Sequence, residues 1–168
     1  MENRKHIVNG RSIAFEERSF FDGRIAMRLP DHFEELPPQK VREIYPLVNI
    51  PDLVLGDVQM DLFVGFRYTE HEITDESIEE FLKIVRMMLE QTGTRMEILA
   101  ERENKAEGHT VASLDLLSHA SAETVYHKLF FCSLKGRILM GFINFPSARG
   151  YHGIMEEIFQ SFRFTGKD

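Results

Sequence analysis

The chain contains seven histidines, the side chains best suited to bind zinc or to move a proton, but they are scattered along it. They occupy positions 6, 32, 71, 109, 119, 127 and 152, without an H-x-H or H-E-x-x-H spacing and without a paired cysteine. Tetrahedral zinc needs several nitrogen or sulfur ligands at constrained spacing. We therefore expect no metal site, and we expect His127, which lies in a strand-like run, to be a packed or hydrogen-bonded side chain.

The densest polar cluster is "TEHEITDE", residues 69–76. Its carboxylates and imidazole, Glu70, His71 and Glu72, could hold a divalent ion together with Asp75 and Glu76. The cluster also leads into a helix, where the helix dipole favours acidic side chains without any ion. We interpret it as a solvated loop, and the sequence leaves open whether that loop binds an ion.

No nucleophile lies in a catalytic pattern. The segment "SLDLLSH" contains Ser113, Asp115, Ser118 and His119, but strand alternation sends neighbouring side chains to opposite faces, and no G-x-S-x-G elbow is present. Cys132, in "LFFCSL", is typical of a buried small hydrophobic residue, since an activated thiolate needs cationic neighbours and exposure. The glycines form neither G-x-G-x-x-G nor a Walker motif. The sequence predicts a protein that is not an enzyme and has no cofactor.

Composition narrows the class of partner. There are 20 basic and 27 acidic side chains, a net charge of −7, which disfavours nucleic acid as a partner. No apolar run is long enough for a membrane span, and the amino-terminal segment lacks the apolar core of a signal peptide, so we expect a cytoplasmic protein. A length of 168 residues with 43% hydrophobic side chains predicts a single domain over residues 1–168.

The elements that position these residues begin with strands. "SIAFEERSF" (12–20) and "RIAMRL" (24–29) are separated by "FDG", a hairpin signal, and Asn9-Gly10 is a possible second turn. A proline-rich loop follows, with a short helix expected over Gln39–Tyr45. "DLFVGFRYT" (61–69) then alternates as a strand does.

A long helix is predicted over residues 74–93. It begins after a cap at Thr74 or Asp75, has acidic residues in its first turn, and ends at Gly93. One apolar stripe at helical spacing predicts the buried face of this helix: Ile78, Phe81, Leu82, Val85 and Leu89.

Four strands and a closing helix complete the chain. "RMEILAERE", "TVASLDLLS", "TVYHKLFFCSL" and "RILMGFINF" are joined by short connections, which predicts antiparallel neighbours. The last two are apolar on both faces, and a strand of this kind is covered on both sides. We therefore predict an α+β fold in which an antiparallel sheet has helices on both faces, an α/β/α sandwich, with the helix near residues 152–162 covering one face.

This order of elements resembles the PsbP-like superfamily, over residues 11–165. The resemblance is carried by "GRIAMRLPDHFEEL", by "ESIEEFLKIVRMML" and by the terminal "IMEEIFQSFRF". The superfamily includes PsbP, a Ran-binding nuclear import factor and bacterial DcrB-like proteins. The resemblance implies a three-layer sandwich that acts by binding other proteins, with no shared catalytic residues.

The function predicted from these observations is a non-enzymatic cytoplasmic protein-interaction module, a bacterial accessory, chaperone-like or immunity-type protein. Aromatic residues in the expected loops are the candidate partner surface. They are Phe20, Phe21, Phe33, Tyr45 and Tyr151. The alternative is a domain that binds a small apolar ligand in a pocket between sheet and helix. The partner and the oligomeric state remain open at this point.

Overall fold

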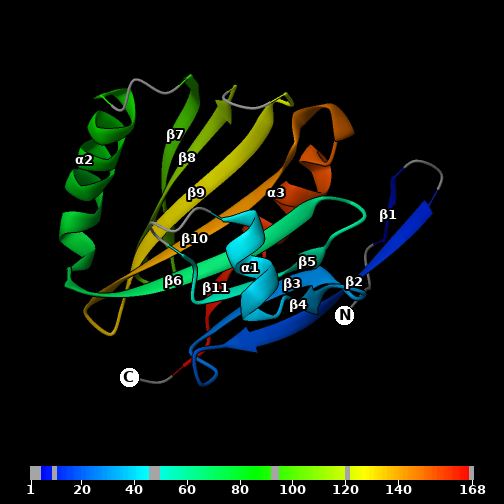
Figure 1. Cartoon of the computed structure of the whole chain (residues 1–168). Helices are drawn as coiled ribbons and strands as arrows, with labels where there is room; N and C mark the ends of the chain where they lie inside the picture. Colours follow the sequence, from blue (N-terminus) through cyan, green and yellow to red (C-terminus); the bar gives the residue numbers. More distant parts are fainter. Residues whose placement is uncertain (1–4, 9–10, 46–49, 92–94, 120–121, 167–168) are drawn as a thin grey trace. The chain divides into compact units, whose positions relative to one another are not determined.

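The computed structural model describes residues 5–8, 11–45, 50–91, 95–119 and 122–166. The chain divides into two compact units, Met1–Phe33 with Gly150–Asp168, and Glu34–Arg149. We call them the first and the second unit and describe each by itself (Figure 1). The expected turn at Asn9-Gly10 and the expected helix end at Gly93 lie outside the described residues.

The first unit contains a four-stranded sheet in the order β1-β2-β3-β11. Its strands are β1 (Lys5–Val8), β2 (Arg11–Phe20), β3 (Ile25–Pro30) and β11 (Arg163–Phe164). The predicted hairpin is confirmed, because β2 pairs with β3 through Phe20 opposite Ile25. Phe21 and Asp22 take left-handed φ angles of 55° and 57° in its turn, and Gly23 follows at 74°.

The closing helix of the chain, α3 (His152–Gln160), packs on β3 of this unit. It buries Ile154, Met155, Ile158 and Phe159, the apolar residues of the terminal segment. The Ser161 hydroxyl ends the helix by donating to the Ile158 carbonyl at 2.6 Å, and it accepts from the Arg28 amide of β3 at 2.7 Å. The apolar residues of α3 are therefore buried in the folded chain.

The second unit contains a seven-stranded antiparallel sheet in the order β4-β5-β6-β10-β9-β8-β7. Its strands are β4 (Glu34–Glu35), β5 (Leu53–Asp57), β6 (Leu62–Glu72), β7 (Met96–Ala106), β8 (His109–Ser118), β9 (Val125–Leu134) and β10 (Arg137–Pro146). The predicted meander of four strands is confirmed as β7 to β10. The short β4 and β5 had no counterpart in the sequence prediction.

The helices of the second unit are α1 (Pro38–Ile44) and α2 (Ile78–Gln91), with 3-10 turns η1 (Asp75–Ser77) before α2 and η2 (Ser147–Arg149) after β10. The predicted short helix begins one residue early because Pro38 takes its first position. Among the described residues no helix is long and apolar enough to cross a membrane.

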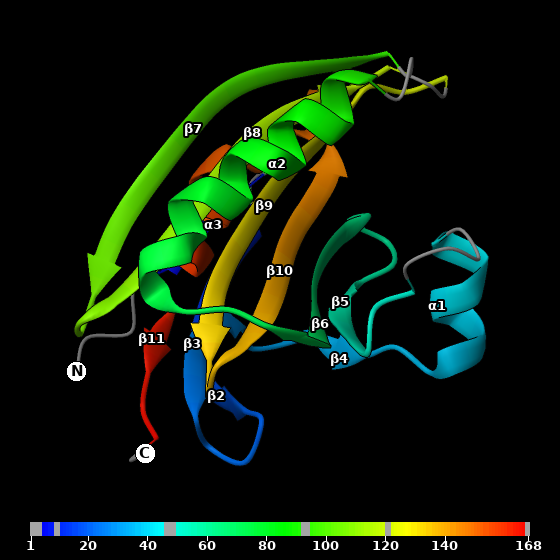
Figure 2. The ribbon, with the colours of Figure 1, turned by 90° about the vertical axis from the view of Figure 1, so that its left-hand side faces the viewer.

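Both α1 and α2 lie on the same face of the seven-stranded sheet (Figures 1 and 2). α2 packs on Phe131 of β9, and Phe131 lies opposite Met140 of β10. α1 packs on Phe63 of β6, which lies opposite Asn144, two positions from Phe142 and four from Met140. Since side chains two positions apart share a face, the two helices are on one side. The α+β class with antiparallel sheets is confirmed, and helices on both faces of one sheet stay a prediction.

Candidate interaction surface

The two flanks of α2 face different strands. Ile78 and Leu82 point into the core below the helix. Phe81 meets Phe131 of β9 edge to face, with ring centroids 5.3 Å apart, so one flank faces β9 and β10. Arg86 donates to Glu101 of β7 at 2.8 Å, so the other flank faces the edge strand of the sheet.

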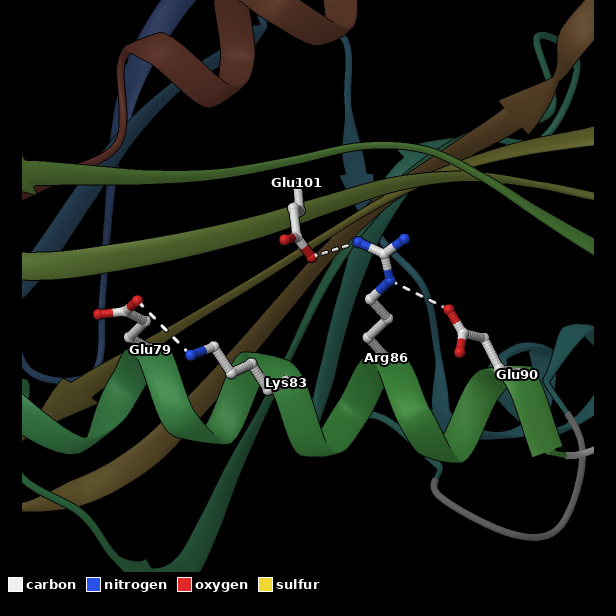
Figure 3. Close-up of polar contacts among 5 residues, drawn as sticks. All are labelled: Glu79, Lys83, Arg86, Glu90 and Glu101. Atoms are coloured by element: carbon white, nitrogen blue, oxygen red, sulfur yellow. Dashed lines mark hydrogen bonds and ion pairs between the residues drawn. The ribbon is translucent and has the colours of Figure 1, made fainter.

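The flank toward β7 is polar (Figure 3). Lys83 lies 3.9 Å from Glu79, and Arg86 bridges Glu90 at 3.0 Å and Glu101 at 2.8 Å. These side chains are largely exposed, and exposed ion pairs contribute about 0–1 kcal/mol each. These ion pairs therefore keep the flank in contact with water and add little to the stability of the helix.

The flank toward β9, by contrast, continues into exposed apolar residues. Ile84, Met87 and Met88 are 46%, 52% and 61% exposed, and we call them the outer stripe. Ile84 and Met88 follow Phe81 at i+3 and i+7, so they share its flank, while Met87 points away from the sheet. α2 is therefore apolar on its buried face and also on part of its outer surface.

The sheet beside this flank is incompletely covered. On the helix face of β9 and β10, five side chains in adjacent rows are half-buried, and we call them the open strip. They are His127, Leu129, Met140, Phe142 and Asn144. Phe131, under α2, and Phe63, in the cluster under α1, are buried by comparison. Leu129 and Met140 pack against the cluster under α2, and Phe142 packs against the cluster under α1, so the strip joins the two clusters and is only partly exposed.

A glycine shapes the floor of the open strip. Gly65 of β6 lies opposite Phe142, and a Cβ at Gly65 would lie 2.1 Å from the Phe142 ring. No real Cβ tolerates that distance, so the ring covers β6 only because residue 65 has no side chain. The aromatic floor of the strip therefore depends on this residue.

One end of the open strip is polar and uncharged. Asn144 donates to the Tyr45 hydroxyl at 3.4 Å, and His127 lies opposite Asn144 in the strand register. Burial lowers the pKa of His127 to about 4, so its ring is neutral at pH 7. Burial also raises the pKa of Tyr45, opposed by its bond to Asn144 and supported by the charge of Asp61. The side chains of His127, Asn144 and Tyr45 offer hydrogen bonds and carry no charge at pH 7, and the charge of Asp61 acts on Tyr45.

The five aromatic residues predicted for a partner surface differ in their exposure and in the unit to which they belong. Phe33 and Tyr151 are only 2% and 3% exposed, so they offer little surface to a partner. Phe20, Phe21 and Tyr45 are half-buried. Only Tyr45 lies in the second unit, where it borders the open strip.

The other polar candidates do not form a catalytic group. Glu70, His71 and Glu72 are the exposed end of β6 instead of a loop. In the described ranges, no three His, Cys, Asp or Glu side chains are grouped to hold a metal ion. Ser113 and His119 are separated by about 20 Å of extended strand. Burial, with a smaller contribution from the charge of Asp75, raises the pKa of Cys132 to about 12, which keeps it a thiol.

No motif in the sequence signals the buried ionic cluster of the second unit. Lys128, 2% exposed, lies 3.2 Å from Asp115 on the sheet face opposite the helices, and the Tyr126 hydroxyl also donates to Asp115. Antiparallel pairing sets Asp115 opposite Lys128, so the two charges meet across adjacent strands. Burying either charge alone is costly, and this explains why the two occur together.

The surface hollows among the residues that the structure describes include two that lie outside the open strip. One, of about 590 Å³, is lined by residues before α2 and at the β9–β10 turn: Glu72, Ile73, Thr74, Ser77, Lys135, Gly136 and Arg137. The other, of about 240 Å³, lies between α2 and β7 and is lined by Arg86, Leu89, Glu90, Met96 and Ile98. Both have charged linings, and the alternative of an apolar ligand pocket stays a prediction.

Comparison with known proteins identifies the fold. No protein-family model matches the chain, and no curated protein does. Cyanobacterial PsbP (CyanoP) from Synechocystis sp. PCC 6803, a solution structure, matches with a TM-score of 0.58 at 12% identity, over 89% of this chain and 92% of that one. PA94 from Pseudomonas aeruginosa, a crystal structure of a protein of unknown function and candidate regulator, matches with a TM-score of 0.50 at 8% identity, over 88% and 94%. The chain therefore has a PsbP-like fold.

Proposed function

We propose that the chain is a non-enzymatic protein-interaction module that receives an α-helix on the open strip. The observation that carries the proposal is the position of the outer stripe of α2 directly beside the half-buried apolar side chains of β9 and β10. The proposal keeps the cytoplasmic location and the bacterial accessory role expected from the sequence. It also keeps an α/β/α arrangement with helices on both faces of the sheet.

Exposed apolar residues that gather in one place are the usual mark of an interaction site. Methionines are enriched at such sites, because their flexible side chains adapt to a partner. The outer stripe has two of them, Met87 and Met88, and the open strip has Met140. The solvated ion pairs on the opposite flank of α2 set the limit of this surface.

The width of the face between α2 and α1 suits one helix. α2 packs mainly over β8, and α1 packs on Val54 of β5 and Phe63 of β6. In the strand order, these positions are three to four strand spacings apart, about 14–19 Å. Packed helices lie about 8–10 Å apart, so a third helix between them needs about 16–20 Å. The two ranges overlap at about 16–19 Å, so a single helix fits at the wider of these spacings, and its apolar face would complete the layer.

A helix-display library tests the proposal. Amphipathic helices with randomised outer positions are selected against the purified chain, and the enriched binders are measured against two variants. We expect Ile84→Glu to weaken binding at least tenfold. Leu99→Glu, which changes a residue of matched exposure on β7 (44% against 46%), should leave binding unchanged.

Circular dichroism of both variants is the control for folding. Two results would contradict the proposal: the absence of any enriched helix, or binders that respond to Leu99→Glu and ignore Ile84→Glu. Either result would show that the surface beside α2 is not a site for a helix.

A further inference from the structure

The second unit carries a helix with a half-exposed apolar stripe and, next to it, a half-buried apolar strip that lies between α2 and α1. We infer that the helix received by the open strip is α2 of a second copy of this chain, in a dimer with two-fold symmetry. This inference rests on the proposed function and names its partner. Its contact is of the isologous kind, in which the same surface serves both copies.

Symmetry dictates how the two helices lie. Each α2 has its own sheet on one side and must have the sheet of the second copy on the other side. The two-fold axis that exchanges both the helices and the sheets then runs parallel to the helices. The two helices are therefore parallel to each other. Equivalent residues of the two copies lie at the same height along the axis. Ile84 and Met88 face the neighbouring helix, and Met87 points at the strip of the second copy.

The heights of the side chains along α2 and along the strands can be matched residue by residue. Phe81 lies at Phe131, which is level with Met140 of β10 and Arg67 of β6. From there α2 runs along β8 toward His127, because Asp75 accepts from the Thr110 amide at the start of that strand.

At about 1.5 Å per helical residue and 3.3 Å per strand residue, Met87 reaches the level of Leu129 and Phe142. The same count brings Gln91 to the level of His127 and Asn144. Apolar side chains thus meet apolar side chains in the middle of the contact.

The two ends of the contact are complementary in charge and in hydrogen bonding. Glu80, exposed and one turn before Ile84, comes level with Arg67 of the second copy. Gln91, an uncharged amide, comes level with the uncharged group formed by His127, Asn144 and Tyr45. Arg86 and its partner Glu101 face away from the contact, whereas Lys83 and Glu90, at i−4 and i+3 from Met87, lie beside it.

The mass of the purified chain in solution tests the inference. Light scattering during size exclusion should give twice 19.6 kDa for the unmodified chain and 19.6 kDa for Ile84→Glu and for Met87→Glu. Leu99→Glu and Val58→Glu, whose exposures of 44% and 52% match those of the test positions, should keep the dimer mass. Circular dichroism confirms that each variant is folded.

A charge exchange separates this arrangement from other dimers. Glu80→Arg and Arg67→Glu should each weaken the dimer at least tenfold, and the double variant should recover most of the loss. A dimer that persists in Ile84→Glu, or an exchange without recovery, overturns the inference. A chain that is monomeric up to millimolar concentration also overturns it, and the proposed function then survives only if library helices still bind in a manner sensitive to Ile84→Glu.

Discussion

The helices α2 and α3 use apolar residues in different ways. α3 has one apolar stripe, and all of it is buried: Ile154, Met155, Ile158 and Phe159. α2 buries only Ile78 and Leu82 completely and carries three further apolar side chains that are about half exposed. Every apolar residue of α3 is buried in the folded chain, but the outer stripe of α2 is about half exposed.

This difference between α2 and α3 indicates which of the two helices carries a candidate functional surface. A segment that is apolar throughout attracts attention in the sequence, and the terminal "IMEEIFQSFRF" is such a segment. The more informative signal is a set of apolar residues outside the buried face of a helix. Their exposure to water is unfavourable, and they do not contribute to the core. That set is on the charged helix α2.

The largest expected effect comes from removing α3. A chain truncated after Arg149 loses α3 and β11, and with them the buried residues that pack on β3. We expect aggregation or loss of cooperative unfolding, measured by solubility and by thermal melting. A soluble fragment of residues 1–149 with a cooperative transition would show that α3 is not needed for the fold.

Substitution of one buried residue gives the next largest effect. Ile158 is fully buried, and Ile158→Ala should lower the free energy of unfolding by about 2–5 kcal/mol, because the cavity cannot close. Urea denaturation measures this change. A loss below about 1 kcal/mol would mean that α3 packs loosely and that the contrast with α2 is weak.

Acid tests the burial of the open strip. The pKa of His127 is about 4 in the folded chain, whereas the ordinary pKa of a histidine side chain is 6.5. The unfolded state therefore binds a proton first, and stability should fall as the pH drops from 6.5 to 4, by up to about 3 kcal/mol.

His127→Gln should remove this part of the pH dependence, and urea denaturation at several pH values measures it. Identical pH profiles for the variant and the unmodified chain would contradict the burial of this side chain. His119→Gln, at a more exposed histidine, is the matched control.

The smallest effect on stability is expected at the outer stripe. Ile84→Ala should change the free energy of unfolding of the isolated monomer by less than about 0.5 kcal/mol, since the side chain is 46% exposed. Urea denaturation in a Met87→Glu background, which keeps the chain monomeric, isolates this number. A cost near that of Ile158→Ala would place Ile84 in the core and would remove the distinction between the two helices.

Much of the fold could be predicted from local signals. The turn at Phe21–Gly23 and the alternation of β6 define strands, and the apolar period of residues 78–89 defines α2. The short β4 and β5 could not be predicted, because a strand of two residues such as Glu34–Glu35 is held by its neighbour and not by its own sequence.

Only part of the candidate surface could be predicted from the sequence. The i, i+3, i+4 spacing of Ile84, Met87 and Met88 is visible in the sequence, and a second stripe opposite the buried one would have been the signal. The tight turn at Lys135–Gly136 also sets His127 opposite Asn144. The placement of α1 and α2 on one face, with space between them, follows from long-range pairing, which no local pattern encodes.

A photo-crosslink from Met87 tests the central claim most directly. A benzoylphenylalanine at this position in the purified chain should, on illumination, give a band of twice the monomer mass, and the crosslinked peptide should map to β9 and β10, residues 125–146. The same probe at Leu99 should give little of that band. A crosslink from Met87 that forms only within one copy, or that maps outside β9 and β10, would contradict the account of α2 as a helix that seats on the open strip.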